Sequence, residues 1–161
     1  MPFNDILTTN QRYTATHDEL ASGRARRGLA IVTCIDSRID PLAALGLIPG
    51  DAKVVRNAGA RVTDDVIRTL IVATHILGVN RIALMQHTDC GIAENSQEAI
   101  VSAVENATGK TCDIDFLMID DQIATLHEDA KRLRECELFP AGIEVGEFIF
   151  DVKKGGLAQI A

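Results

Sequence analysis

The sequence predicts an α/β fold with a mainly parallel central sheet flanked by helices. Two observations lead to this prediction. Short runs rich in β-branched residues alternate with segments of helical periodicity along the 161 residues, and this alternation is typical of parallel sheets built from strand–helix units. The first three strand candidates are nearly continuous in apolar residues, as expected of strands that are covered on both faces.

Four segments are predicted to be strands because they combine apolar, β-branched and aromatic residues over a short length. They are residues 29–35 (LAIVTCI), 52–57 (AKVVRN), 81–87 (RIALMQH) and 143–152 (IEVGEFIFDV).

The helices are predicted from apolar periodicity and from end signals. Between the second and third strands, apolar residues recur from 66 to 77 and stop at Gly78, a typical residue after a helix end. This stripe is wide, so we expect the helix to pack on the sheet and on a second subunit. A narrower stripe predicts a peripheral helix near 119–136. Asp40 followed by Pro41 predicts an N-cap and a first helical residue.

Composition narrows the classes of function. The length and the 47% of hydrophobic residues suit a single α/β domain over residues 1–161, with residues 1–27 as an N-terminal helical arm. A net charge of −7 disfavours nucleic acid as a partner. The N-terminus lacks a secretory pattern and no apolar stretch is long enough to span a bilayer, so we expect a cytoplasmic protein without a membrane partner.

Chemically unusual residues follow two of the predicted strands. The first strand leads into CIDSR, which contains Cys34, Asp36 and Arg38. The third leads into HTDCG, which contains His87 and Cys90. If these strands are neighbours, their carboxyl ends bring the two thiols and the imidazole together. Two thiolates and one imidazole suit Zn²⁺, and three protein ligands leave one position open, as in catalytic zinc sites.

The residues alone leave other interpretations open. A single cysteine after a strand is most often a small core residue, and H-x-x-C spacing by itself is a weak metal signal. Asp36 and Arg38 also fit a loop ion pair without chemistry.

The motifs resemble those of the β-class carbonic anhydrases. The stretches that carry the resemblance are CIDSRID at 34–40, RNAGA at 56–60, HTDCG at 87–91 and GEFIFDVKKGGL at 146–157. They occur in the family's order and run from about residue 28 to the end. The short N-terminal region resembles the compact branch of the family, which includes relatives that hydrolyse carbon disulfide or carbonyl sulfide.

The resemblance implies one Zn²⁺ per chain, held by Cys34, His87 and Cys90. It implies hydration of CO₂ to bicarbonate by a zinc-bound hydroxide, with Asp36 as the acceptor that orients the hydroxide. Arg38, always charged and able to donate two bonds, would hold Asp36 ionised and aimed. The resemblance also implies a homodimer or a larger homo-oligomer.

Four further residues are candidate substrate contacts: Asn57, Ala58, Gly59 and Gly91. The first three belong to a loop that lies beside the site in the family. The alternative for Gly59 is a tight turn that needs glycine, and the alternative for Gly91 is a residue that begins a helix.

Other functions stay open at this point. One is zinc-dependent hydrolysis of CS₂ or COS on the same scaffold. Another is a non-catalytic domain that binds zinc or bicarbonate. Redox use of Cys34 and Cys90 is a weaker alternative, because they lack C-x-x-C spacing. Whether Asp36 itself closes the fourth metal position at neutral pH also stays open.

Overall fold

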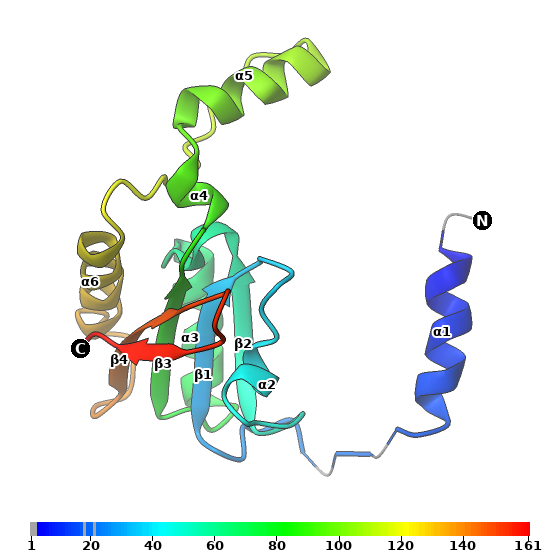
Figure 1. Ribbon diagram of the computed structural model, residues 1–161. Helices are drawn as coiled ribbons and strands as arrows, with labels where there is room; N and C mark the ends of the chain where they lie inside the picture. The colour runs from blue at the N-terminus through cyan, green and yellow to red at the C-terminus, as the bar shows by residue number, and fades with distance from the viewer. Residues whose placement is uncertain (1–2, 18, 21) are drawn as a thin grey trace.

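A five-stranded sheet forms the centre of the molecule in the computed structural model, which describes residues 3–17, 19–20 and 22–161 (Figure 1). The strand order is β2-β1-β3-β4-β5. The first four of these pair in parallel, and β5 pairs antiparallel with β4. The predicted α/β class with a mainly parallel sheet is therefore confirmed. The strands are β1 (Leu29–Cys34), β2 (Ala52–Asn57), β3 (Arg81–His87), β4 (Glu144–Phe150) and β5 (Leu157–Gln159).

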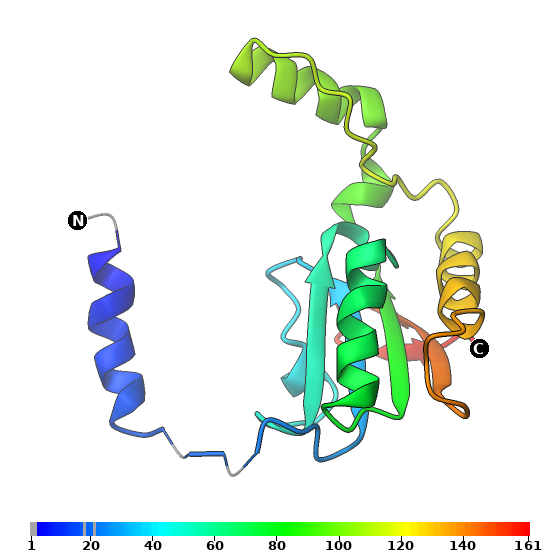
Figure 2. The same ribbon diagram turned by 180° about the vertical axis from the view of Figure 1, so that it is seen from behind.

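Helices connect the strands and cover the sheet. They are α1 (Asn4–Thr14), α2 (Pro41–Ala44), the 3₁₀ turn η1 (Ala58–Ala60), α3 (Asp64–His75), α4 (Gly91–Glu94), α5 (Gln97–Thr108) and α6 (Gln122–Arg134). Seen from behind, α3 and α6 lie over one face of the sheet (Figure 2), and α2 packs on the other face.

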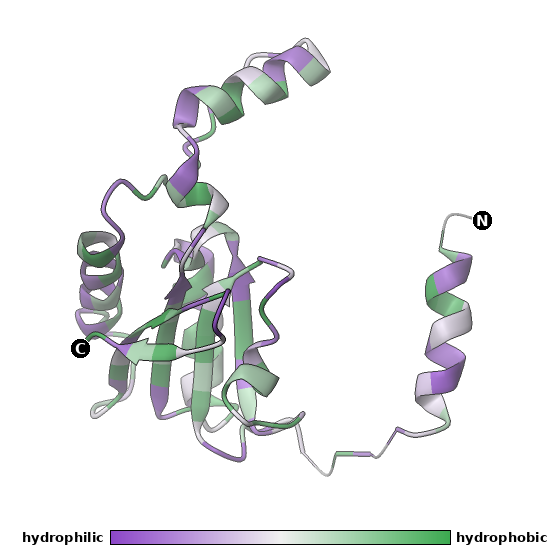
Figure 3. Cartoon of the chain, in the orientation of Figure 1, coloured by the Kyte–Doolittle hydropathy of each residue, from purple (hydrophilic) through white to green (hydrophobic). Residues whose placement is uncertain are grey.

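The main core lies between the sheet and the pair α3 and α6. Its fully buried side chains alternate along the strands, as the two-residue period of a strand requires. They include Ala30, Val32, Ile82 and Leu84 of the sheet, Val66, Leu70 and Ala73 of α3, and Leu126, Ala130 and Leu133 of α6. Coloured by hydropathy, β1 and β3 are mostly hydrophobic (Figure 3), in line with their burial. The expectation that β2 is also covered on both faces is wrong, because β2 is an edge strand without a fully buried residue.

Local signals explain most of the element boundaries. The Asp40 side chain accepts from two backbone N–H groups of α2, and Pro41 is its first residue, as the sequence predicted. The predicted helix near 119–136 begins only at Gln122, because the side chain of Asp121 accepts from the Ala124 N–H and caps it there. The prediction that this helix is peripheral is wrong, since its apolar stripe lies in the main core. Strand β4 ends before Asp151, whose carboxylate accepts from the N–H groups of Lys153 and Lys154 and closes a turn.

Two helices stand away from the rest of the fold (Figure 1). Among the described residues, neither α1 nor α5 contains a buried side chain. Part of the predicted arm over 1–27, namely residues 1–2, 18 and 21, lies outside the described residues. The single-domain organisation stays a prediction. Within the described part of the chain, no helix is both long and apolar enough to cross a membrane.

Candidate metal centre

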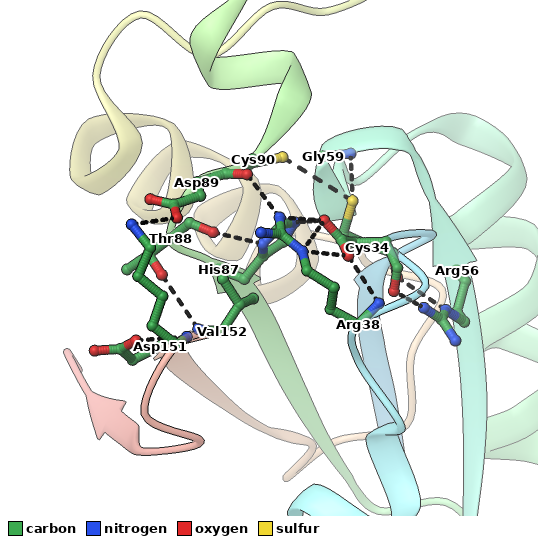
Figure 4. Close-up of polar contacts among 12 residues, drawn as sticks. Cys34, Arg38, Arg56, Gly59, His87, Thr88, Asp89, Cys90, Asp151 and Val152 are labelled. Carbon is green, nitrogen blue, oxygen red and sulfur yellow. Dashed lines mark hydrogen bonds and ion pairs between the residues drawn. The ribbon is translucent and has the colours of Figure 1, made fainter.

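Three potential metal ligands meet at the carboxyl edge of the sheet (Figure 4). Strands β1 and β3 are neighbours in register, with Thr33 opposite Met85, so the residues that follow them lie side by side. Cys34 ends β1, His87 ends β3, and Cys90 precedes α4. Their ligand atoms all lie within 4.8 Å of one another, and all three residues are buried. The neighbouring strands assumed from the sequence are thus present.

The imidazole of His87 is oriented as a metal ligand would be. Its Nδ1 lies 2.8 Å from the backbone carbonyl of Thr88, and a carbonyl can only accept, so Nδ1 carries the proton. In the neutral ring, Nε2 is then an unprotonated lone pair. The His87 side chain is 1% exposed, and its Nε2 is a buried atom without a hydrogen-bond partner.

The two thiols form a close but unbonded pair. Cys34 Sγ lies 4.0 Å from Cys90 Sγ, about twice the length of a disulfide bond. The hydrogen bond from Cys90 is the largest cause that lowers the pKa of Cys34, to about 3, and the bond from the Gly59 N–H adds to it. The same bond and burial raise the pKa of Cys90. The pair therefore accommodates one thiolate well, whereas ionisation of the second thiol is unfavourable without a nearby cation.

These features fit zinc. In a tetrahedral site with Zn–S bonds of about 2.3 Å, the two sulfur atoms lie roughly 3.8 Å apart, close to the observed 4.0 Å. Burial lowers the pKa of His87, but the neighbouring Cys34 sulfur and its negative charge raise it, and the net direction is upward. A buried site that favours positive charge, with an unpartnered imidazole nitrogen and two thiols, matches the donor set of Zn²⁺.

Beside the ligands, Asp36 and Arg38 form a bidentate ion pair. Arg38 Nη2 lies 2.6 Å from Asp36 Oδ2, and Nε lies 2.9 Å from Oδ1. This hydrogen bonding holds the pKa of Asp36 well below its ordinary value. Asp36 Oδ2 also lies 3.9 Å from His87 Nε2. The pair predicted from the sequence is therefore formed next to the three ligands.

The RNAGA loop contacts the centre through its backbone. The N–H of Gly59 donates to Cys34 Sγ at 3.4 Å. Gly59 has φ +76°, and a Cβ there would lie 3.2 Å from side-chain atoms of both Ile92 and Ile119, so the turn requires glycine. Asn57 closes the loop on itself: Nδ2 donates to the Arg61 carbonyl, and Oδ1 accepts from the Arg61 N–H.

The other two candidate substrate contacts are exposed. Ala58 lies in η1 between Asn57 and the buried Gly59. Gly91 is the first residue of α4, which agrees with its alternative interpretation as a residue that begins a helix. Whether Asn57, Ala58, Gly59 and Gly91 contact substrate stays a prediction.

Side chains from other elements hold the two ligand loops by their carbonyl groups. Arg56 donates from Nε to the Cys34 carbonyl and from Nη2 to the Asp36 carbonyl. Gln122, at the start of α6, donates to the His87 carbonyl at 2.8 Å. Arg38 Nη2 donates to the Asp89 carbonyl at 2.9 Å. Sequence reasoning missed Arg56 and Gln122, because a side chain that bonds a distant carbonyl leaves no spacing signal.

The HTDCG loop is also tied to the turn that follows β4. Lys153 Nζ lies 2.7 Å from Asp89 Oδ2, and the N–H of Val152 donates to Thr88 Oγ1 at 3.2 Å. Asp89 itself has φ 53°, a left-handed conformation that aspartate tolerates better than most residues. These contacts stabilise the backbone between His87 and Cys90 from the side opposite β1.

The remaining histidines and cysteines with described side chains lie outside the cluster. His75 is exposed and bonds the Leu138 carbonyl at 2.9 Å. His127 pairs with the buried carboxylate of Glu147, and His17 contacts Tyr13. Cys112 and Cys136 are half-buried free thiols. The one group of metal-ligating side chains found in residues 3–17, 19–20 and 22–161 is Cys34, His87 and Cys90.

Comparison with known proteins assigns the family. The carbonic anhydrase family profile matches residues 29–138. β-Carbonic anhydrase 1 of Mycobacterium tuberculosis is 31% identical over 161 residues, covering 96% of this chain and 99% of that protein. The chain belongs to the β-class carbonic anhydrase family. The predicted family and enzyme class, an enzyme of the carbonic anhydrase type, are therefore confirmed.

Two further relatives of this β-class carbonic anhydrase are informative. A crystal structure of carbonic anhydrase from Streptococcus mutans superposes with a TM-score of 0.92 at 34% identity and covers 100% of this chain and 98% of that one. A carbon disulfide hydrolase of Acidithiobacillus thiooxidans is 35% identical over 154 residues, covering 81% of this chain and 76% of that protein. The scaffold is thus shared with relatives that carry two different activity names.

Proposed function

We propose that this chain hydrates CO₂ to bicarbonate at a zinc ion held by Cys34, His87 and Cys90. The observation that supports this most strongly is the buried, unpartnered Nε2 of His87 beside two thiols. Three protein ligands leave one of the four zinc positions for solvent or substrate. The bidentate pair of Asp36 and Arg38 lies directly next to that cluster.

When bound, zinc lowers the pKa of a coordinated water towards neutrality and so supplies a hydroxide nucleophile at physiological pH. The residues of the chain then have separate tasks. The two thiolates neutralise the charge of the dication, and the Gly59 N–H, which donates to Cys34 Sγ, stabilises one of them. His87 is held in the correct tautomer by its bond to the Thr88 carbonyl.

Asp36 is the acceptor that orients the nucleophile. With a metal held by the three ligands, its carboxylate would accept a hydrogen bond from the nucleophile and so orient it towards CO₂. Arg38 makes this acceptor reliable, because it keeps the carboxylate ionised and fixes its plane with two donors. Asp36 is therefore proposed as a catalytic residue, and Arg38 as the residue that positions it.

Hydrolysis of CS₂ or COS is the second candidate, favoured by the 35% identity to the A. thiooxidans carbon disulfide hydrolase. All these substrates are linear and have an electrophilic central carbon, so the same ligands serve either reaction. A non-catalytic zinc domain is less consistent with the site, since a structural zinc is closed by four protein ligands.

Stopped-flow CO₂ hydration on protein of known zinc content tests the proposal, with CS₂ and COS hydrolysis measured on the same preparation. We expect CO₂ turnover proportional to zinc content and at least tenfold faster than turnover of either sulfur compound. Protein with one zinc per chain that hydrolyses CS₂ and leaves CO₂ at the uncatalysed rate would replace the proposal with the second candidate. Inactivity on all three substrates would favour a binding domain.

We also propose that the chain forms a homodimer or a larger homo-oligomer, with α1 docked on a second copy. An isolated helix of 11 residues is marginal in water, yet α1 exposes Ile6, Leu7 and Tyr13. Sedimentation velocity tests this. Wild-type protein is expected to sediment as a dimer or larger, Leu7→Asp to shift towards the monomer, and Gln11→Glu, on the same helix, to remain assembled. A wild-type monomer would contradict the proposal.

A cytoplasmic location is proposed on the chemistry of the thiols. Cys34 and Cys90 must stay reduced to bind zinc, and the cytosol keeps thiols reduced. Fractionation of the native cells, followed by immunoblotting, tests this: recovery outside the cytoplasm would contradict it.

A further inference from the structure

Arg56 lies at the end of the edge strand β2, where an exposed arginine is ordinarily a solvated surface residue. Its guanidinium nevertheless points across to the loop after β1 (Figure 4). Nε lies 2.8 Å from the Cys34 carbonyl oxygen, and Nη2 lies 2.7 Å from the Asp36 carbonyl oxygen. One planar group therefore bridges two backbone carbonyls, two residues apart.

These two carbonyls lie where β1 ends and the chain leaves the sheet. At the end of a strand, backbone groups lose the partners that the next strand supplied. The N–H of Ile35 still donates to the Asn57 carbonyl at 3.0 Å, but β2 then turns into η1, whose Gly59 N–H goes to the Cys34 sulfur instead. Arg56 donates instead to the carbonyls on either side of Ile35, those of Cys34 and Asp36.

The charge of Arg56 has no carboxylate partner among the residues that the structure describes. Both hydrogen bonds that its guanidinium makes with the described residues go to neutral carbonyl oxygens. Arg56 therefore acts on the geometry of the loop and does not neutralise a charge. Its two donors, at a fixed spacing, set the distance between the two carbonyls and their directions. A lysine, with one ammonium group, cannot reproduce that spacing.

The two carbonyls belong to the residues whose side chains build the site. Cys34 is a proposed metal ligand and Asp36 the proposed acceptor, and the carbonyl orientation of each residue is coupled to the direction of its side chain. Arg38 fixes the Asp36 carboxylate through side-chain bonds, whereas Arg56 fixes the backbone from which both side chains start.

We infer that Arg56 is a positioning residue of the metal centre, which aims the Cys34 thiol and the Asp36 carboxylate by bridging their backbone carbonyls. The inference rests on the proposed function, because it takes Cys34 as a ligand and Asp36 as the acceptor. It assigns Arg56 no contact with substrate.

The test compares Arg56→Ala and Arg56→Lys with Arg68→Ala, a matched control on α3 whose guanidinium forms only an exposed pair with Asp65. Four quantities are measured on each full-length protein: the rate of zinc release to a chelator, the visible absorption of the Co²⁺-substituted form, kcat and KM for CO₂ hydration, and the melting temperature.

For Arg56→Ala we expect zinc release to be about tenfold faster, the range found when groups that orient metal ligands are removed. The cobalt–thiolate bands are expected to shift, and kcat to fall by about tenfold with KM unchanged, because orientation rather than binding is lost. Arg56→Lys should show the same changes at smaller size. Millimolar guanidinium chloride should restore part of the kcat of Arg56→Ala and leave Arg68→Ala unaffected.

Zinc release, cobalt spectrum and kcat of Arg56→Ala within twofold of Arg68→Ala would overturn the inference. Wild-type values of zinc release, cobalt spectrum and kcat in Arg56→Lys would also overturn it, because a group that bridges the two carbonyls would then be unnecessary. If Arg56→Ala does not fold, the Lys variant decides. A wild-type protein inactive on CO₂ would remove the proposed function, while zinc release and the cobalt spectrum would still decide the role of Arg56.

Discussion

Two arginine–aspartate pairs lie at opposite ends of strand β1, and they serve different purposes. At the amino end, Arg26 Nε donates to Asp51 Oδ1 at 3.0 Å, and the Ile48 N–H donates to Oδ2 at 3.1 Å. Asp51 is buried, and each of its oxygens has a partner. This pair joins the segment before β1 to the turn before β2, and both of its carboxylate oxygens are already hydrogen-bonded.

At the carboxyl end, the Asp36–Arg38 pair lies beside a buried polar atom that has no hydrogen-bond partner. Asp36 Oδ2 lies 3.9 Å from His87 Nε2, a buried nitrogen without a hydrogen-bond partner. Two buried thiols complete the cluster. Buried polar atoms without partners are rare in folded proteins and call for an explanation; the proposed metal ion would supply it here.

The difference shows that an arginine–aspartate pair does not by itself mark a catalytic site. What distinguishes the carboxyl end is the group beside the pair: a buried imidazole nitrogen without a hydrogen-bond partner, next to two buried thiols. Substitutions at the carboxyl end should therefore lower activity, whereas substitutions at the amino end should lower stability and leave activity unchanged.

The largest effect is expected when a ligand is removed. Cys90→Ser should lose zinc and lower the CO₂ hydration rate by at least about a thousandfold, because the metal supplies several kcal/mol of barrier reduction. Zinc analysis and stopped flow measure this. Cys112→Ser, a half-buried thiol outside the cluster, is the control and should retain both zinc and rate.

Removing the acceptor should leave the metal in place. Asp36→Asn is expected to keep one zinc per chain and to lower kcat/KM by about a hundredfold, because a neutral amide orients the nucleophile poorly. A variant with kcat/KM within threefold of wild type would show that Asp36 forms only a structural ion pair, as Asp51 does at the amino end.

A conservative change at Arg38 tests the bidentate geometry. Arg38→Lys keeps the charge but not the two parallel donors, so we expect about a tenfold loss in kcat/KM with zinc retained. Arg26→Lys, at the other end of β1, is the matched control and should leave kcat/KM unchanged. Equal rates for Arg38→Lys and wild type would mean that charge alone suffices.

The smallest effect on activity is expected at Asp51. Hydrogen bonds from the Ile48 N–H and from Arg26 lower the pKa of Asp51. The ionised form therefore stabilises the fold above the ordinary aspartate pKa of about 3.9, and this contribution is lost as the pH falls through the lower folded value. Asp51→Asn should lower Tm at pH 7, approach wild type in Tm near pH 3, and leave kcat unchanged. A Tm difference that persists unchanged at pH 3 would contradict this.

Much of the fold was predictable because its signals are local. The four parallel strands follow from apolar runs, and α2 follows from Asp40 and Pro41. The site was predictable for a related reason: when parallel strands are neighbours, the residues after them must meet, which places Cys34 beside His87.

The features that the sequence did not predict depend on distant partners. Helix α5 has no buried residue, so its apolar positions did not show the pattern of a helix packed on a core. Arg56 and Gln122 bond carbonyls 20 and 35 residues away, a relation that only the folded chain reveals. One exception is local: Asn57 bonds Arg61, four residues along the chain, which gives Asn57 a structural contact within its own loop.

X-ray absorption at the zinc edge of the wild-type protein tests the central claim most directly, namely that the carboxyl end holds a three-ligand metal centre. The account predicts two sulfur ligands at about 2.3 Å and two lighter nitrogen or oxygen ligands at about 2.0–2.1 Å, with one sulfur in Cys90→Ser if any zinc remains. A shell of three or four sulfur atoms, or a shell without sulfur, would contradict it.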